Sequence, residues 1–358
     1  MQRLLGCNDE KGRREVSTHH TTVRMKDIAK DLGVSVVTVS KVLRNHPDIA
    51  DETRERVLAR MKKLDYRPNL AARTLATGRT YLVGLVVPDL LHPFFAEVAK
   101  SLSDVLKANG YYLLISSSDE DPDLEKKEVE QLLARRLDAL IIASCCLTAD
   151  LFFRIEKQKT PYVLVDRHLE GLSADFVGVD DEAVGMLATN HLIEAGCKRI
   201  AHIRGPETSP GIRRLAGYKR ALARAGTKVN KDYIIPELKG DVETRQRGAD
   251  AMSQLLSRKP RPDGVFCFND PLAIGAMNYA LDHGVRIPED LAIIGCGNLH
   301  YDDSLRVPLS SIDQDSRRIG AEVARITLGI LNSKVPPKHE AIVLQPQLVV
   351  RRSTARPR

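Results

Sequence analysis

The segment VVTVSK at residues 36–41 places two adjacent valines beside two hydroxyls and a lysine. A valine exposed on a helix can pack on the methyl group of thymine, the apolar group that the major groove of DNA presents. The hydroxyls of Thr38 and Ser40 can bond phosphates or base edges, and Lys41 supplies a cation. Together these side chains could read a DNA groove, unless the valines serve only as packing residues of a small domain.

A helical wheel separates the two valines. In a helix that begins at Val36, each residue adds about 100° to the rotation. Val37 and Lys41 then point to one side, whereas Val36 and Ser40 lie on the flank. The core side is formed by Val39, Val42 and Leu43. We predict that Val37 faces solvent, and we leave Val36 shared between packing and DNA contact.

Three short helices are needed to hold this segment, and the sequence predicts them at residues 26–31, 36–43 and about 51–64. Gly33 ends the first helix, and Ser35 can cap the second by accepting a backbone N–H. The third helix carries one apolar stripe, which consists of Val57, Leu58, Met61 and Leu64. A tight glycine-containing turn between the first two helices is typical of a helix-turn-helix, which we place at residues 23–67.

The excess positive charge of the chain is confined to the same end. Residues 1–80 hold 17 Lys and Arg against 10 Asp and Glu, whereas the remaining residues hold 37 of each. A compact basic module beside a neutral body favours a polyanionic partner. Residues 1–22 are polar and aperiodic, so we predict a disordered tail, and Met25 could be the natural first residue.

The remainder of the chain, residues 81–353, alternates apolar β-rich runs with amphipathic stretches. Strands are predicted at 81–87, 111–117, 139–144, 162–166, 176–180, 199–203, 264–268, 291–296 and 341–350. Helices are predicted at about 93–109, 123–135, 181–195, 212–225, 242–257, 270–283 and 316–332. This alternation indicates an α/β fold with parallel sheets covered on both faces, and its length favours two lobes. Residues 68–80 form a linker with about two turns of helix formers, and residues 354–358 form a tail.

Several classes of protein are excluded by what the sequence lacks. It has no run of about 18 apolar residues and no apolar leader, so we expect a cytoplasmic protein without membrane spans. The six cysteines show no CxxC spacing and the histidines no metal-site spacing, so no disulfide framework, metal or cofactor is expected. We find no P-loop, GxSxG, HExxH, or GxGxxG after a strand, which argues against an enzyme.

Two motifs carry a resemblance to a known family. MKDIAKDLGVSVVTVSKVLRN and ADETRERVLARMKKLDYRPNLAARTLA resemble the LacI/GalR family of transcription repressors, and the similarity extends to LVVRRS, over roughly residues 24–353. The resemblance implies a small all-α helix-turn-helix domain joined by a hinge helix to a two-lobed, periplasmic-binding-protein-like domain. It also implies a DNA-binding repressor whose operator affinity is controlled by a small effector, a sugar or sugar derivative.

The resemblance gives the linker a function. In the family this hinge helix folds on operator DNA and pairs across the dimer axis. Leu75 matches the residue that wedges into the minor groove, Ala72 matches the close contact between the paired helices, and Asn69 would contact phosphate or cap the helix. The predicted DNA-binding residues are Met25, Val36, Val37, Thr38, Ser40, Lys41, Asn69, Ala72 and Leu75.

An effector is expected between the lobes, at the carboxyl ends of the strands. The resemblance places six side chains there: His92, Phe95, Asp166, Arg214, Asp270 and Gln314. Phe95 would stack on a sugar ring or base, and Asp166 would accept hydrogen bonds from hydroxyls. Arg214 would reach a hydroxyl or carboxylate of the ligand, unless it is only a surface cation. Asp270 matches the family's ligand aspartate, but it could instead cap the helix that follows it.

Two positions depart from the family pattern. Ala50 stands where the family usually has Ser or Thr before the third helix, so Asp48 or Asp51 is expected to cap that helix. Gly297 stands where the family strand IIGFDD carries an aspartate that often binds sugar hydroxyls. The lost carboxylate speaks against a standard hexose or pentose and favours a modified, acidic or larger ligand.

The expected partners follow from the same features. One helix-turn-helix reads only a half-site, so a homodimer on a pseudo-palindromic operator is expected. No heptad tail follows the last strand, which favours a dimer over a tetramer. The competing possibility is a solute-binding protein of a transporter, which the absence of a signal peptide and the basic helix-turn-helix both oppose.

Overall fold

The computed structural model describes residues 23–43, 46–66, 74, 78–236, 244–335 and 337–356. Two compact units make up the chain, the first ending at Gly78 and the second beginning at Arg79. The boundary lies inside the segment 68–80 that the sequence predicts as a linker. The predicted tail at residues 1–22 lies outside the described residues.

Three helices form the first unit: α1 (Met25–Leu32), α2 (Val36–Leu43) and α3 (Asp51–Lys63). As predicted, Gly33 ends α1 in a left-handed conformation, with φ of 66°. Ser35 caps α2 as predicted, because its Oγ accepts from the backbone N–H of Thr38 at 3.0 Å. The small core between the helices consists of Ile28, Ala29, Val39, Val42, Val57 and Met61.

Three expectations for this unit were wrong. Leu43 and Leu58 were assigned to the core sides of their helices, but they are 37% and 48% exposed, because six other side chains already fill so small a core. Ala50 is the N-cap of α3, and no side chain caps this helix. Asp48 is unable to cap it because its carboxylate is bonded to Lys41 and His46 instead.

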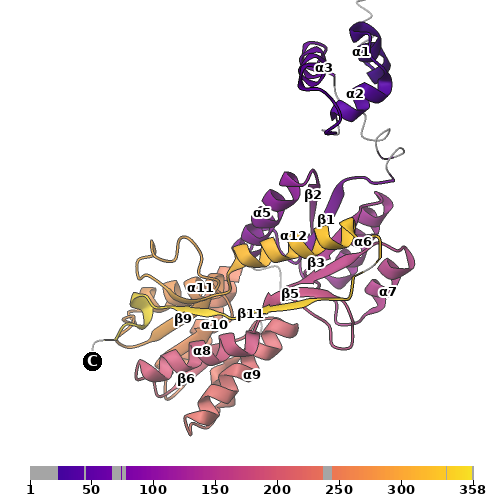
Figure 1. Ribbon diagram of the computed structural model, residues 1–358. Helices are drawn as coiled ribbons and strands as arrows, with labels where there is room; N and C mark the ends of the chain where they lie inside the picture. Colours follow the sequence, from indigo (N-terminus) through magenta and orange to yellow (C-terminus); the bar gives the residue numbers. More distant parts are fainter. Residues whose placement is uncertain are drawn as a thin grey trace, which may run out of the picture. The chain divides into compact units, whose positions relative to one another are not determined.

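The second unit consists of two lobes, each built around a six-stranded sheet (Figure 1). The first lobe contains β1 (Leu82–Val87), β2 (Tyr112–Ser117), β3 (Ala139–Ile142), β4 (Tyr162–Val165), β5 (Asp175–Val179), β11 (Ala341–Leu344), α5 (Pro93–Ala108), α6 (Pro122–Ala134), α7 (Asp150–Lys157) and α12 (Ser316–Asn332). Its strand order is β11-β5-β4-β3-β1-β2, and every pairing is parallel.

The second lobe repeats this plan with one antiparallel edge. It contains β6 (Ile200–Ile203), β7 (Ile234–Ile235), β8 (Gly264–Cys267), β9 (Ala292–Cys296), β10 (Ser310–Asp313), β12 (Gln347–Val349), α8 (Asp181–Glu194), α9 (Ser209–Arg224), α10 (Thr244–Ser257), α11 (Asp270–Asp282) and the 3-10 turns η1 (Lys231–Tyr233) and η2 (Arg352–Thr354). The strand order is β12-β10-β9-β8-β6-β7, and only β12 is antiparallel to its neighbour.

Helices cover both faces of each sheet, which is why the central strands β1, β3, β8 and β9 are apolar and buried along almost their whole length. In the first lobe α5 and α12 pack on one face and α6 and α7 on the other. In the second lobe α10 and α11 cover one face and α8 and α9 the other. The prediction of an α/β fold with two lobes and parallel sheets is therefore confirmed. No helix in the described ranges is long and apolar enough to cross a membrane.

The chain passes between the lobes three times: after β5, after β10, and between β11 and β12. The carboxyl ends of the parallel strands and the helix N-termini that follow them therefore face the space between the lobes. The side chains that begin α5 and α11 belong to opposite lobes but meet at this gap. This topology positions the candidate ligand site.

The structure differs from the sequence prediction in five places. The run 341–350 forms two short strands in different sheets, because Pro346 has no N–H to continue a ladder. Strand β10 was missed because its sequence, SSID, is polar, and α7 and β7 were also missed. Thr354 is not part of a tail, since it is buried and its hydroxyl lies 2.7 Å from His191 Nε2.

Candidate functional site

The outer side of α2 carries both valines of the opening segment. Val37 is 61% exposed, which confirms the prediction that it faces solvent, and Val36 is 43% exposed. Val39 and Val42, one turn further along, are buried in the core. The two adjacent valines are therefore surface groups at the N-terminus of the second helix of a helix-turn-helix, where base edges are contacted in that motif.

The polar residues beside these valines are already held in place. The Thr38 hydroxyl lies 2.9 Å from the Ser35 hydroxyl. Lys41 Nζ lies 2.5 Å from a carboxylate oxygen of Asp48, and His46 Nδ1 lies 2.5 Å from the other. The bond from Lys41, more than the one from His46, holds the pKa of Asp48 below its usual value. A DNA phosphate would have to compete with Asp48 for Lys41.

The remaining predicted DNA contacts fall into two groups. The Met25 side chain is partly buried and packs against the three-helix core, so it supports α1. Ser40 is partly buried on α2. Asn69, Ala72 and Leu75 lie outside the described residues.

A pocket lies between the two lobes, as the strand topology predicts. Its cavity volume is about 90 Å³, which is room for several waters. Of the six predicted ligand residues, five line it: His92, Phe95, Asp166, Arg214 and Gln314.

Asp270, the sixth predicted residue, does not line this pocket. It is fully buried inside the second lobe, where its carboxylate accepts from the Ser311 hydroxyl at 2.7 and 2.9 Å. A Cβ at Gly297 would lie 2.8 Å from one oxygen of Asp270. The buried Asp270 carboxylate thus occupies the space beside the position where the family strand carries its aspartate, which gives a steric reason for Gly297.

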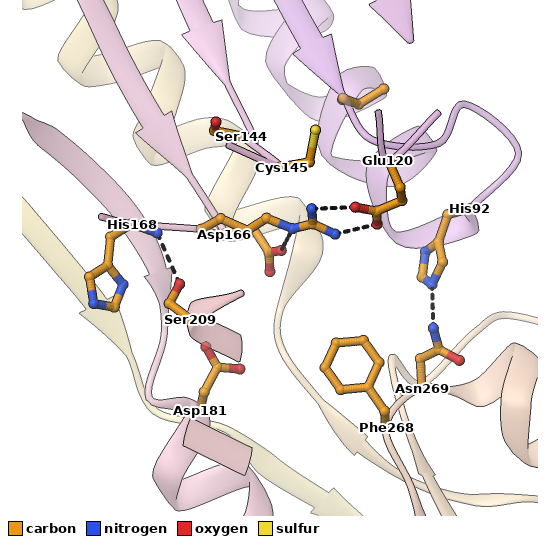
Figure 2. A network of polar contacts seen from close by, with 12 residues as sticks. His92, Glu120, Ser144, Cys145, Asp166, His168, Asp181, Ser209, Phe268 and Asn269 are labelled. Atoms are coloured by element: carbon orange, nitrogen blue, oxygen red, sulfur yellow. Dashed lines mark hydrogen bonds and ion pairs between the residues drawn. The ribbon is translucent and has the colours of Figure 1, made fainter. Parts of the chain in front are cut away.

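Asn269, the residue before Asp270, lines the pocket instead and connects the lobes. Its Oδ1 caps α11 by accepting from the N–H of Leu272 at 2.9 Å. The amide nitrogen therefore points away from the helix, and it lies 3.0 Å from His92 Nε2 in the first lobe (Figure 2). Since Nε2 must accept this bond, the proton of the neutral imidazole is on Nδ1.

The His92 ring is held neutral by its surroundings. Burial, followed by the positive charges of Arg167 and Arg214, lowers the pKa of His92 to about 4. Its Nδ1 is buried without a hydrogen-bond partner. The ring lies edge-on to Phe95, with 5.7 Å between ring centroids. His92 therefore offers one N–H donor at the cleft, and Phe95 supports it.

Arg214 is the most enclosed of the predicted ligand residues that line the pocket. Its Nε donates to Asp181 at 2.8 Å and its Nη1 to the carbonyl oxygen of Phe268 at 2.8 Å. The guanidinium carbon also lies 4.5 Å from the centroid of the Phe268 ring, a cation–π arrangement. Arg214 is thus a buried ion-pair partner that borders the pocket, and the alternative of a surface cation is wrong.

Further lining residues were missed in the sequence, among them Glu120, Arg167, Arg204, Phe268 and Asn269. Most follow the carboxyl end of a strand, so the rule that ligands bind there could have identified them. Burial, followed by repulsion from Asp181, raises the pKa of Asp166 to about 6. Among the described residues, no three His, Cys, Asp or Glu side chains are grouped to hold a metal ion.

Comparison with known proteins relates both ends of the chain to known families. Residues 24–69 match the family model of bacterial regulatory proteins, lacI family, and residues 189–354 match a periplasmic binding protein-like domain. The chain is 34% identical over 336 residues to the HTH-type transcriptional regulator DegA of Bacillus subtilis (strain 168), covering 92% of this chain and 97% of that protein. It is 32% identical over 314 residues to catabolite control protein A of Priestia megaterium, covering 87% and 93%.

Two solved structures are similar to this chain over most of its length. The lac repressor dimer bound to operator and the anti-inducer ONPF matches with a TM-score of 0.78 and 25% identity, over 93% of this chain and 99% of that chain. The CelR–cellobiose complex, a transcriptional regulator, matches with a TM-score of 0.70 and 28% identity, over 92% and 99%. These relatives are transcription regulators and not enzymes. The chain belongs to the lacI family of bacterial regulatory proteins and is a DNA-binding transcription regulator.

Proposed function

We propose that this regulator is a repressor that binds a pseudo-palindromic operator as a homodimer, and that a sugar or sugar derivative bound between its lobes controls operator affinity. The observation that carries the proposal is the pocket lined by both lobes and crossed by the bond from Asn269 to His92. A ligand that enters there must break or replace cross-lobe contacts. It therefore binds the open and closed arrangements differently, which is the condition for shifting the population between them.

The start of the second unit offers a route from the pocket to the linker. Asp138, in the first lobe, accepts from the backbone N–H groups of Thr80 and Tyr81, both at 2.9 Å. The Arg79 guanidinium donates to the Tyr111 hydroxyl at 3.1 Å. The end of the linker is thus tied to the first lobe, so a rotation of that lobe would move the point from which the hinge residues emerge.

The proposal is tested by selecting an operator from random DNA with the full-length protein and then titrating a panel of sugars, sugar acids and sugar phosphates. Fluorescence anisotropy of the labelled operator measures the affinity. We expect at least one compound to bind the protein and to change operator affinity by about 5–150-fold, the usual range of such coupling. Operator binding that no pocket ligand alters would contradict control by an effector.

Replacing Val37 with glutamine is expected to change the selected half-site. The valine offers only methyl groups to a thymine methyl, whereas glutamine favours an adenine edge, and one such contact is worth about 1–3 kcal/mol of base discrimination. Leu58→Gln is the matched control, because Leu58 is an exposed leucine on α3 rather than α2. An unchanged consensus from the Val37→Gln protein would show that Val37 does not read bases.

Replacing Leu75 with alanine is expected to weaken specific operator binding by about 2 kcal/mol, a factor of about 30, because the apolar wedge at the centre of the site is lost. Binding of the effector, measured by calorimetry without DNA, should stay unchanged. Operator affinity equal to that of the wild type would remove the wedge role.

A further inference from the structure

Arg167 is a buried cation whose partner is unusually exposed. Arg167 lies just after β4 in the chain, lines the pocket, and is 6% exposed. It donates two parallel hydrogen bonds to Glu120, from Nη1 at 2.8 Å and from Nη2 at 2.6 Å. The Glu120 side chain remains 37% exposed, so solvent and ligands can reach the carboxylate more easily than they reach the guanidinium.

A buried guanidinium needs an anionic partner. Removing one member of a buried ion pair leaves an uncompensated charge, and neutral hydroxyls do not replace a bidentate carboxylate. Asp166 is the other carboxylate nearby, but its Oδ2 lies 3.8 Å from Arg167 Nε, and that Nε has no hydrogen-bond partner. Glu120 therefore supplies the main neutralising contact, and it can leave only if another anion arrives.

The loop that carries Glu120 is held in a conformation of raised energy. Asp119 and Glu120 follow β2 with φ of 49° and 59°, two successive left-handed residues without glycine. Non-glycine residues in this region cost of order 1 kcal/mol or more each. The ion pair with Arg167 and the hydrogen bond from the backbone N–H of Glu120 to the Pro88 carbonyl, at 3.1 Å, both hold this conformation.

The rest of the pocket lining favours an acceptor-rich ligand. Four guanidinium groups line it, together with the carboxylates of Asp89, Glu120 and Asp166; the arginines are Arg167, Arg204, Arg214 and Arg247. Two of these arginines also pair with carboxylates outside the lining, Arg214 with Asp181 at 2.8 Å and Arg204 with Glu207 at 2.7 Å. Among the described residues that line the pocket, the buried polar atoms without a hydrogen-bond partner are all nitrogens that carry a proton: His92 Nδ1, Arg167 Nε and Arg204 Nε. Arg167 also borders a second hollow of about 280 Å³, which gives space for rearrangement around it.

We propose that the effector carries an anionic group, a carboxylate or a phosphate monoester, and that this group replaces Glu120 on Arg167. Glu120 is then a placeholder that keeps the guanidinium paired while the pocket is empty. The proposal rests on the proposed function, since it specifies the chemistry of the ligand of that same pocket.

The placeholder role is tested without knowing the ligand, by replacing Glu120 with glycine in the full chain. Glycine fits the left-handed φ without strain, so the variant should fold, but it leaves Arg167 without its partner. We expect acetate or inorganic phosphate to raise the melting temperature of Glu120→Gly by about 3 °C or more relative to chloride of equal ionic strength. The wild type, whose site is filled by Glu120, should not respond.

Asp119→Gly is the matched control, because Asp119 is the neighbouring left-handed residue and bonds to Ser117 rather than to Arg167. Its melting temperature should rise because the backbone strain at residue 119 is relieved, and acetate or phosphate should not change it further. Equal responses of the two variants to these anions, or no response of Glu120→Gly, would overturn the placeholder role.

The class of ligand is tested by calorimetry with matched compounds: glucose, gluconate, glucuronate and glucose 6-phosphate, and the corresponding galactose set. We expect a charged member to bind the wild type at least about tenfold more tightly than its neutral parent. The carboxylate and phosphate members distinguish the two sources of charge. Glu120→Gln, which removes the competing carboxylate, should tighten the binding of the charged member further.

The two proposals fail in different ways. A neutral sugar that binds as tightly as its acid and alters operator affinity would overturn the anionic ligand and keep effector control. A charged compound that binds in the pocket and leaves operator affinity unchanged would keep the anionic site and overturn effector control. If none of these compounds binds, the anionic site is kept when acetate or phosphate stabilises Glu120→Gly, and it is overturned when neither does.

Discussion

Replacing Arg214 with methionine is expected to lower the free energy of unfolding of the second unit by about 3–5 kcal/mol, the usual cost of breaking a buried ion pair. Arg214 and Asp181 are 3% and 4% exposed and lie 2.8 Å apart, so the variant leaves a carboxylate buried without its cation. The same change removes the donor to the Phe268 carbonyl and the cation above the Phe268 ring. Urea unfolding followed by circular dichroism measures the effect.

The same two helices provide the control. Arg220 on α9 and Glu182 on α8 form an exposed pair at 2.6 Å, and Arg220→Met should cost no more than about 1 kcal/mol. The double variant Arg214→Met with Asp181→Leu removes both buried charges and should recover most of the lost stability. A loss for Arg214→Met as small as that for Arg220→Met would show that burial does not set the strength of this pair.

The free energy of unfolding of the wild type is expected to fall as the pH rises, and replacing Asp302 with asparagine is expected to remove much of this dependence. Asp302 is buried beside Asp270, and burial, followed by repulsion from Asp270, raises the pKa of Asp302 to about 9. The folded protein therefore keeps a proton that the unfolded chain releases above its ordinary pKa of 3.8. The stabilising contribution is complete below that value and is lost as the pH rises toward 9, by at most about 1.4 kcal/mol for each pH unit.

Unfolding free energies measured between pH 5 and pH 8.5 check this dependence. The wild type should become less stable across the window, and Asp302→Asn should show a flatter profile and higher stability at pH 8. Asp303→Asn is the control, because Asp303 is exposed and adjacent in sequence. A wild-type profile that is flat or rises with pH would mean that the Asp270–Asp302 pair does not retain the extra proton.

The helix-turn-helix shows what periodicity can and cannot supply. The wheel placed Val37 outside and Val39 inside, because the direction of a side chain is set by rotation along the helix. It failed for Leu43 and Leu58, because it does not report how much apolar surface the neighbouring helices can cover. That amount depends on packing between helices that are distant in sequence.

The pocket shows the same limit at the level of single residues. The strand-end rule located the site, and five of six proposed residues line it, but Asp270 points into the second lobe while Asn269 points into the pocket. Motif matching does not distinguish a cap from its neighbour when both are polar. Likewise SSID was not recognised as a strand, because its serines are buried by bonds to Asp270, Arg351 and Thr354 that arise only in the folded lobe.

The double role of Asn269 has a consequence for how the two lobes respond to acid. In the structure the Asn269 amide, which the helix cap holds in place, donates to Nε2 of His92, so this nitrogen carries no proton. Burial keeps the pKa of His92 near 4. Separation of the lobes would expose the imidazole to water, and its pKa would then rise toward the ordinary value of 6.5. Separation is then accompanied by proton uptake between about pH 4 and 6.5, and acidification favours the open arrangement. The hydrogen bond between Asn269 and His92 would therefore make the balance between closed and open lobes depend on pH.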